Sequence, residues 1–211
     1  MTKPEIIGAS RSTYTWAIRI LCEEKAIDYT LIETAIRSAE LRAIHPFAKM
    51  PVLRHGDVRL FESMAIAVYL DRAFPGPQFI PSEALPAALT EQWVSLVNTT
   101  IDRTLIRTYL FAYIATPDGK PNRAAIEAVL PEMGQQIAVL DSAVTKTGHL
   151  VGVQLTYADI NLMPILYRIQ HFPEGTAAMA EAPQLSAYYK RHAARPSFTR
   201  TIPPAGVPKT S

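Results

Sequence analysis

Cysteine is nearly absent from the sequence, since Cys22 is the single one among 211 residues. One thiol cannot form an internal disulfide or a cysteine-rich zinc site, so an apolar core must stabilise the fold. Hydrophobic residues make up 48% of the chain, which is enough to fill such a core. We therefore expect a globular protein that is compatible with a reducing compartment.

An excess of either charge is also missing. The chain has 21 Lys and Arg against 19 Asp and Glu, and both signs are spread evenly over its two halves. No basic face of the kind that binds nucleic acid stands out. No apolar run approaches the roughly 18 to 20 residues that span a bilayer, and the N-terminus lacks the apolar core of a signal peptide. We expect a cytoplasmic protein that binds neither nucleic acid nor membrane.

Short strand and helix patterns alternate through the first 75 residues. Strands are predicted at 5–8, 28–32, 51–53 and 58–61, and helices at 15–25, 38–44 and 62–72. Gly56, in the turn RHGD, supplies the positive φ that a tight hairpin requires. The resulting order, βαβαββα, predicts a compact α/β domain over residues 1–75.

Prolines separate this domain from a different second half. The segment FPGPQFIPSEALP contains four prolines and predicts a linker at 76–86. Long helical patterns follow, which predict an all-helical domain over 87–199 and a loose tail over 200–211. Thr156 and Asp159 are spaced as a capping box, and they introduce an apolar helix that we expect at the centre of this domain.

Motifs in both halves resemble those of the cytosolic glutathione S-transferases. The segments that carry the resemblance are SRSTYTWAIRILCEEK, HPFAKMPVL, LFESMAIAVYL, TYADINL and ARPSF. It covers nearly the whole chain and implies a thioredoxin-like N-terminal domain followed by an all-α domain. It also implies a homodimeric detoxification enzyme that uses glutathione as co-substrate, needs no metal, and attacks a hydrophobic electrophile with the glutathione thiolate.

The motif KMPVL is the first part of the implied glutathione site. In the family, the proline of this motif follows a cis peptide bond, and the matching residue is Pro51, after Met50. Such a bond would turn the backbone N–H and C=O of Val52 outward, where an extended peptide can pair with them. The alternative is that Pro51 is an ordinary edge-strand proline.

Three charged or polar residues complete the implied peptide site. A helix N-terminus attracts a carboxylate, so Ser63 and the backbone beside it can hold the γ-glutamyl carboxylate while Glu62 pairs with the ammonium group. Lys49 would reach the glycyl carboxylate. The alternative for Glu62 and Ser63 is an ordinary helix cap. His45 stands where the family often has asparagine, and we assign it no role.

The catalytic group must convert the glutathione thiol to a thiolate. A thiol of pKa about 8.5 is only roughly 3% ionised at pH 7, and a pKa lower by about two units raises that fraction to about three quarters. One charge-assisted hydrogen bond, at about 1.5 to 3 kcal/mol, suffices for this. Alignment with serine-type members through EEK points to Ser12, with Tyr14 and Thr13 as alternatives and Arg11 as a supporting charge.

The second substrate is implied to lie between the domains, against the long helix from Leu89 to Ala115. Its candidate contacts recur at steps of four or two, and they are Arg103, Arg107, Tyr109 and Tyr113. Cys22 lies too far into the first helix to act in the loop, and it is expected in the core, while His149 and His171 show no metal-ligand spacing. The alternative functions are a non-catalytic glutathione-binding protein and a glutathione-dependent isomerase or reductase.

Overall fold

The computed structural model describes residues 2–116 and 119–204. These residues form two compact units. The first unit contains the described residues up to 82 together with 194–204, and the helical unit contains those from 83 to 193. The predicted fold class, a thioredoxin-like domain followed by an all-α domain, is confirmed.

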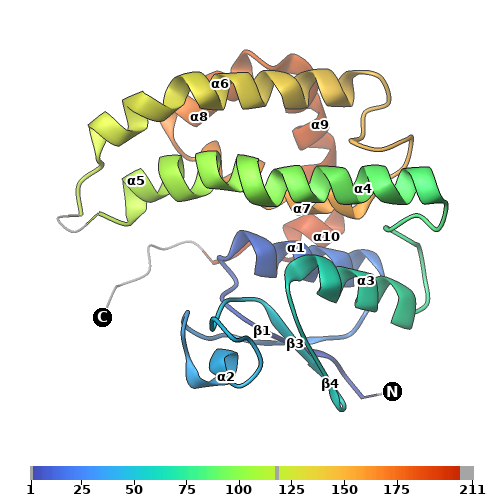
Figure 1. Ribbon diagram of the computed structural model, residues 1–211. Coiled ribbons are helices and arrows are strands. Elements are labelled where there is room, and N and C mark those ends of the chain that lie inside the picture. The colour runs from blue at the N-terminus through green and yellow to red at the C-terminus, as the bar shows by residue number, and fades with distance from the viewer. Residues whose placement is uncertain (1, 117–118, 205–211) are drawn as a thin grey trace. The chain divides into compact units, whose positions relative to one another are not determined.

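A four-stranded mixed sheet organises the first unit, with strand order β2-β1-β3-β4. β1 is parallel to β2 and antiparallel to β3, and β3 forms a hairpin with β4. Figure 1 shows α1 and α3 on one face of the sheet and α2 on the other. The bounds are β1 Glu5–Ile7, α1 Thr13–Glu24, β2 Thr30–Ile32, α2 Ala39–Arg42, β3 Val52–His55, β4 Val58–Phe61 and α3 Ser63–Ala73. The predicted order of elements is therefore confirmed.

Residues 194–204 pack into the first unit, which corrects the predicted end of the chain. The indole Nε1 of Trp16 donates to the hydroxyl of Thr201 at 2.8 Å, and the Trp16 ring lies 4.9 Å from that of Phe198 in α10, Pro196–Thr199. Arg195 binds both carboxylate oxygens of Glu24. Thr201 and Pro203 are buried in this unit, so residues 200–204 are packed against it rather than forming a loose tail. The remainder of that predicted tail, 205–211, lies outside the described residues.

A buried ion pair in the first unit contacts the segment that follows α3 and leads to the helical unit. Nζ of Lys25 lies 3.2 Å from Oδ1 of Asp71, and both side chains are almost fully buried. Lys25 also donates to the carbonyl of Pro77, and Asp71 accepts from the backbone N–H groups of Phe79 and Ile80. Since a buried charge is stable only when it is paired and hydrogen-bonded, these contacts bind the first part of the predicted linker to the first unit.

The helical unit has α-helices packed around α7, whose apolar sequence is almost completely buried. The predicted capping box at its start is confirmed, with Asp159 accepting from the Thr156 N–H at 2.9 Å. The bounds are α4 Ala84–Leu96, η1 Val97–Ile101, η2 Arg103–Leu110, α5 Phe111–Ile114, α6 Arg123–Thr145, α7 Tyr157–Ile169, α8 Pro173–Ala180 and α9 Pro183–Ala193.

The stretches η1 and η2 are π-helix, which the sequence pattern did not predict. A π-helix bonds residues five apart, and the side chains follow that spacing here. Arg107 binds Asp102, five residues earlier, with Nε 2.9 Å from Oδ2, and the Thr108 hydroxyl donates to the Arg103 carbonyl. Steps of four therefore do not describe the faces of this segment.

Candidate functional site

Strand pairing brings the predicted glutathione-binding segments to one end of the sheet. Val52, the first residue of β3, lies opposite Ile7, the last residue of β1, and also opposite Phe61, the last residue of β4. The loop after β1, the segment before β3 and the residues after β4 must therefore emerge together. These are the segments that contain Ser12, Pro51 and Glu62.

Ser12 is the N-cap of α1. Its Oγ accepts a hydrogen bond from the Thr15 N–H at 3.4 Å, and the side chain is half-buried. The hydroxyl proton takes no part in this bond, so it can be donated to a ligand at the helix start. The partial positive charge of the helix N-terminus favours a negatively charged ligand there.

The loop before Ser12 is fixed by Glu33, a residue that sequence reasoning missed. The carboxylate accepts from the Ser10 hydroxyl at 2.7 Å and from the Ser10 N–H at 2.9 Å. Further along, the Arg11 guanidinium donates to the Pro204 carbonyl at 3.1 Å. Only the fold could reveal these partners, because they lie 23 and 193 residues away in the sequence.

Gly8 allows α1 and the Met50 segment to approach each other closely. A Cβ on Gly8 would lie 2.6 Å from the Thr15 hydroxyl and 3.3 Å from Cβ of Met50, which is too close for another side chain. The backbone N–H of Ala9 points at the Met50 sulfur, 3.2 Å away. The Ser12 loop and Met50 are therefore neighbours.

The alternative donors Thr13 and Tyr14 lie in the first turn of α1. Thr13 is buried, with 6% of its surface exposed, and Tyr14 is half-buried. Both have contacts within the protein. Ser12 differs from them in standing at the cap itself, where its hydroxyl faces the end of the helix.

The peptide bond between Met50 and Pro51 is cis, as the resemblance predicted. The expected outward orientation of the Val52 backbone is wrong. The two-residue turn makes His55 and Val58 a hydrogen-bonded pair, so the backbone groups of His55 point toward β4. Backbone groups alternate between the two sides of a strand, so those of Val52, three residues earlier, point toward β1 and pair with Ile7. Among the described residues, the backbone of Met50 makes no hydrogen bond, so its N–H and C=O are the ones that a peptide can use.

Glu62 and Ser63 lie at the start of α3, where the sequence predicted them. Ser63 is buried at the first helical position, whereas the Glu62 carboxylate is 68% exposed. Glu62 has a φ of +68°, a strained value for a residue other than glycine. Lys49, one residue before Met50, is exposed.

The helical unit uses two of the predicted second-substrate residues for its own packing. Tyr109 is fully buried, and its hydroxyl donates to Glu174 at 3.0 Å and accepts from the Gly175 N–H at the same distance. Tyr113 donates to the same carboxylate, which Arg123 also contacts at 3.3 Å. Burial raises the pKa of both tyrosines. Because the polar groups of this cluster are hydrogen-bonded to one another, the cluster has a structural role, and Tyr109 is not presented to a ligand.

The other two second-substrate candidates, Arg103 and Arg107, are exposed on η2. Arg107 is held by Asp102 and lies over the Phe111 ring, 5.3 Å from its centre. Phe111 and Ile114 expose 36% and 44% of their surface. This stretch therefore presents cationic and apolar groups together.

Cys22 is fully buried in α1, and burial raises the pKa of its thiol, so it belongs to the core as predicted. Across residues 2–116 and 119–204, no three or more His, Cys, Asp or Glu side chains are grouped so that they could hold a metal ion. Within the same residues, none of the helices combines the length and apolar character needed to cross a bilayer.

Two open hollows on the first unit lie away from Ser12. The larger, about 490 Å³, is lined by residues of the segment from Ala26 to Leu31 together with Glu23. The smaller, about 250 Å³, is lined by the N-terminal residues and by Phe74 and Pro75. Neither lining includes a candidate binding residue, so the chemistry of the segments, rather than the size of a hollow, identifies the site.

Comparison with known families agrees with this geometry. Residues 6–78 match the family model "Glutathione S-transferase, N-terminal domain", and residues 88–196 match "Glutathione S-transferase, C-terminal domain". The two matches cover most of the chain. They coincide with the sheet-containing and helical parts of the structure.

Individual relatives are similar over nearly their full length. Glutathione S-transferase 3 of Zea mays is 25% identical, covering 99% of this chain and 96% of that protein. A stringent starvation protein A homolog of Haemophilus ducreyi is 24% identical, covering 90% and 85%. The solved theta class glutathione S-transferase of Xanthomonas axonopodis pv. citri, with glutathione bound, is 26% identical with a TM-score of 0.82, covering 97% and 99%. The chain therefore belongs to the glutathione S-transferase family.

Proposed function

We propose that this protein is a glutathione transferase in which the Ser12 hydroxyl stabilises the thiolate of bound glutathione. The observation that carries this proposal is the convergence at one sheet end of a helix-capping serine, a segment with a cis proline and a helix start with an acid. Family membership agrees with it. The activity is transfer of glutathione to an electrophile.

Ser12 acts as a hydrogen-bond donor in this proposal. Its oxygen accepts from the Thr15 N–H, which leaves the hydroxyl proton to point at the ligand sulfur. A hydrogen bond to a charged group contributes about 1.5 to 3 kcal/mol, which corresponds to lowering a thiol pKa by about one to two units. The thiol proton passes to solvent, and the thiolate then attacks the electrophilic carbon. A carbon–sulfur bond forms as the bond from that carbon to a leaving group breaks, and the leaving group departs into solvent as an anion with the electron pair of that bond.

The peptide is bound by the segments around Ser12. The backbone of Met50, turned by the cis bond before Pro51, pairs with the cysteinyl unit. Glu62 receives the ammonium group of the γ-glutamyl end, and Ser63 with the start of α3 receives its carboxylate. Lys49 contacts the glycyl carboxylate. Val52 contributes by fixing the register of β3 and not through its own backbone groups.

We further propose that the second substrate is an apolar electrophile and that the helical unit contacts it through the exposed stretch containing Arg103, Arg107 and Phe111. The protein is a cytoplasmic homodimer in this proposal, in keeping with the family it belongs to. Ile36 and Phe47 are large apolar side chains that are exposed on the first unit, and a second copy can cover them. Sedimentation analysis of the purified protein tests the dimer.

A non-catalytic glutathione-binding protein is the second candidate. It is favoured by the similarity to the stringent starvation protein A homolog, whose name does not describe a transferase. A reductase would need a reactive cysteine near the ligand, and the buried Cys22 does not provide one. A glutathione-dependent isomerase would use the same thiolate as the transferase, so assays with isomerisable substrates distinguish those two.

The test is a titration of the glutathione thiol bound to wild type and to Ser12→Ala, followed by ultraviolet absorption of the thiolate. Wild type should lower the thiol pKa, and Ser12→Ala should raise it again by about one to two units while glutathione affinity changes less than about threefold. Conjugation should then fall about 10- to 100-fold at neutral pH. Ser142→Ala, the same change on the exposed face of α6, is the matched control.

Three results would move or end the proposal. An unchanged titration in Ser12→Ala, with a changed one in Tyr14→Phe or Thr13→Ala, transfers the role to that residue. A wild-type protein that binds glutathione without lowering its thiol pKa is a binding protein, and one that neither binds glutathione nor conjugates any of a broad panel of electrophiles is not a transferase.

A further inference from the structure

His45 is a buried histidine in direct contact with Glu62. The residue lies in the loop between α2 and β3, and only 3% of its surface is exposed. Its ring packs against that of Phe61, with 4.8 Å between ring centres, and its Nε2 lies 3.4 Å from Oε1 of Glu62. The histidine thus joins the segment before β3 to the residue that precedes α3.

The orientation of the ring fixes which nitrogen carries the proton. The backbone N–H of Phe47 donates to Nδ1 of His45 at 3.0 Å. Nδ1 must therefore present its lone pair, and the neutral ring carries its proton on Nε2. A hydrogen thus lies on the side of the ring that faces the Glu62 carboxylate.

Glu62 needs such a neighbour more than an ordinary surface acid does. Its backbone has a positive φ of 68°, a conformation that persists only where the surroundings hold it. Its side chain is 68% exposed, so solvent alone would leave the carboxylate free to rotate. His45 contacts one oxygen of the carboxylate from the protein side and leaves the exposed side to a ligand.

We infer that His45 is a positioning residue, which orients the Glu62 carboxylate toward the ammonium group of an amino-acid ligand. The inference rests on the proposed function, from which it takes glutathione as the ligand. His45 itself does not touch the ligand. Its effect must therefore pass through Glu62 and must require the ligand's ammonium group.

Three measurements follow for His45→Ala. The Kd of glutathione should rise about 5- to 10-fold, somewhat less than for loss of a full charge-assisted hydrogen bond, while kcat at saturating glutathione stays within about twofold. The increase should vanish in a Glu62→Gln background, and it should also vanish for N-acetylglutathione, which lacks the ammonium group. His45→Gln, whose amide nitrogen can take the place of Nε2, should restore most of the affinity.

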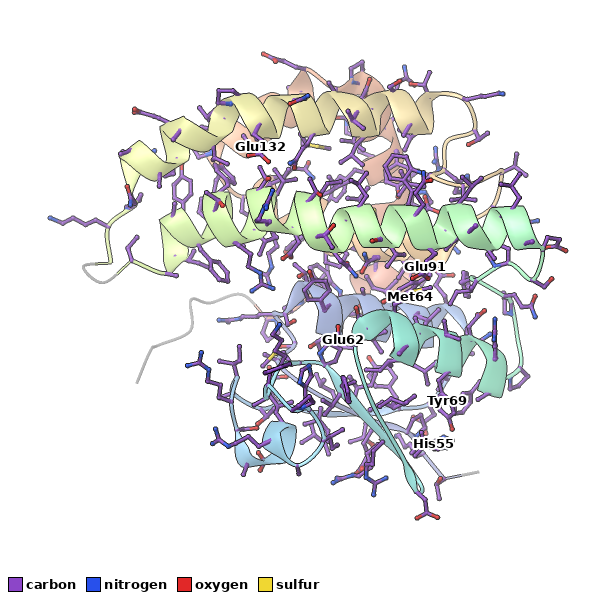
Figure 2. The ribbon with its side chains drawn as sticks, viewed as in Figure 1. His55, Glu62, Met64, Tyr69, Glu91 and Glu132 are labelled. Carbon is purple, nitrogen blue, oxygen red and sulfur yellow. The ribbon has the colours of Figure 1, made fainter. Side chains whose placement is uncertain are left out.

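His55 provides the matched control. It is the last residue of β3, at the end of the β3–β4 hairpin opposite Glu62 (Figure 2), and its ring nitrogens bond the Tyr69 hydroxyl and the Thr2 carbonyl. His55→Ala removes an equally well-bonded ring and should leave glutathione affinity unchanged. If His45→Ala and His55→Ala weaken glutathione binding equally, or if the His45→Ala loss persists with N-acetylglutathione, the positioning role is wrong.

Nitrogen NMR of histidine-labelled protein tests the contact without glutathione. We expect the His45 ring to be protonated on Nε2. We also expect its Nε2 resonance to shift in Glu62→Gln, a variant that leaves His45 itself unchanged. A proton on Nδ1, or no shift in Glu62→Gln, overturns the inference. If wild type does not bind glutathione, the proposed function fails and the positioning role for that ligand fails with it, whereas a negative His45 result in a glutathione-binding protein overturns this inference alone.

Discussion

Two polar clusters of this protein, one in each unit, are partnered in opposite ways. In the helical unit, Tyr109, Tyr113, Arg123 and Glu174 bond to one another, so each polar group has its partner inside the unit. At the sheet end of the first unit, the Glu62 carboxylate has a contact on one side and solvent on the other, and Lys49 is exposed.

This difference separates structural polar residues from binding residues. In a closed network the polar groups are hydrogen-bonded to one another within the protein, and removal of one member leaves another buried group without a partner. A group that is held from one side retains capacity for a ligand. Substitutions should therefore change stability in the first case and ligand affinity in the second.

Glu62→Gln should have the largest effect and sharpen the contrast most. The loss of one charge-assisted bond, at about 1.5 to 3 kcal/mol, should raise the Kd of glutathione roughly 10- to 150-fold. The melting temperature should stay nearly constant because the carboxylate is 68% exposed. Calorimetric titration and thermal unfolding measure the two quantities. A large loss of stability without a loss of affinity would contradict the assignment of Glu62 to binding.

Tyr109→Phe should do the reverse. It removes a buried hydroxyl that both donates to Glu174 and accepts from the Gly175 N–H, which should lower the free energy of unfolding by about 1 to 3 kcal/mol. Glutathione affinity should not change. Urea unfolding followed by circular dichroism provides the measurement, and Tyr113→Phe, on a half-buried ring, is the milder control. An unchanged unfolding midpoint would show that the network is not closed.

Lys49→Ala should have a small effect on affinity. An exposed ion pair contributes about 0.2 to 1 kcal/mol, so the Kd of glutathione should rise less than about fivefold, and the difference should shrink as salt concentration rises. Glutathione binding in low and high salt measures this effect. A loss as large as that of Glu62→Gln would mean that Lys49 is less exposed in the complex than it is here.

The smallest expected effect concerns the pH dependence of the helical unit. Burial opposes ionisation of Glu174, but hydrogen bonds from Tyr113 and Tyr109 and the nearby Arg123 charge outweigh it and lower its pKa from 4.5. A carboxyl whose pKa is lower in the folded protein than in the unfolded protein stabilises the fold at pH values above its unfolded-state pKa. This stability is lost as the pH falls through its folded-state pKa. The difference in melting temperature between wild type and Glu174→Gln should therefore shrink below pH 4.5. A difference that grows in acid would reverse this assignment.

Local patterns predicted the order of elements and the capping box, whereas the cis bond before Pro51 was predicted from the family resemblance. The local patterns succeeded because helix starts and tight turns impose their geometry on neighbouring residues. The hairpin around Gly56 is an example, since two residues and a positive φ suffice to define it.

Features that depend on distant partners could not be predicted in this way. The contact of His45 with Glu62 joins two loops, and the Val52 backbone is used by Ile7, which only the pairing of β1 with β3 reveals. Tyr109 resembled a ligand contact until its partner in α8 was known. The π-helical stretch was not predicted because the α-helix and the π-helix differ by less than one residue per turn, and the spacing of apolar residues does not distinguish the two.

The packing of residues 194–204 into the first unit has a consequence for biosynthesis. A ribosome makes all four strands of the sheet before Arg195 and Thr201, the partners of Glu24 and Trp16, have been synthesised. Part of α1 therefore stays uncovered until residues 194–204 have emerged and can pack against it.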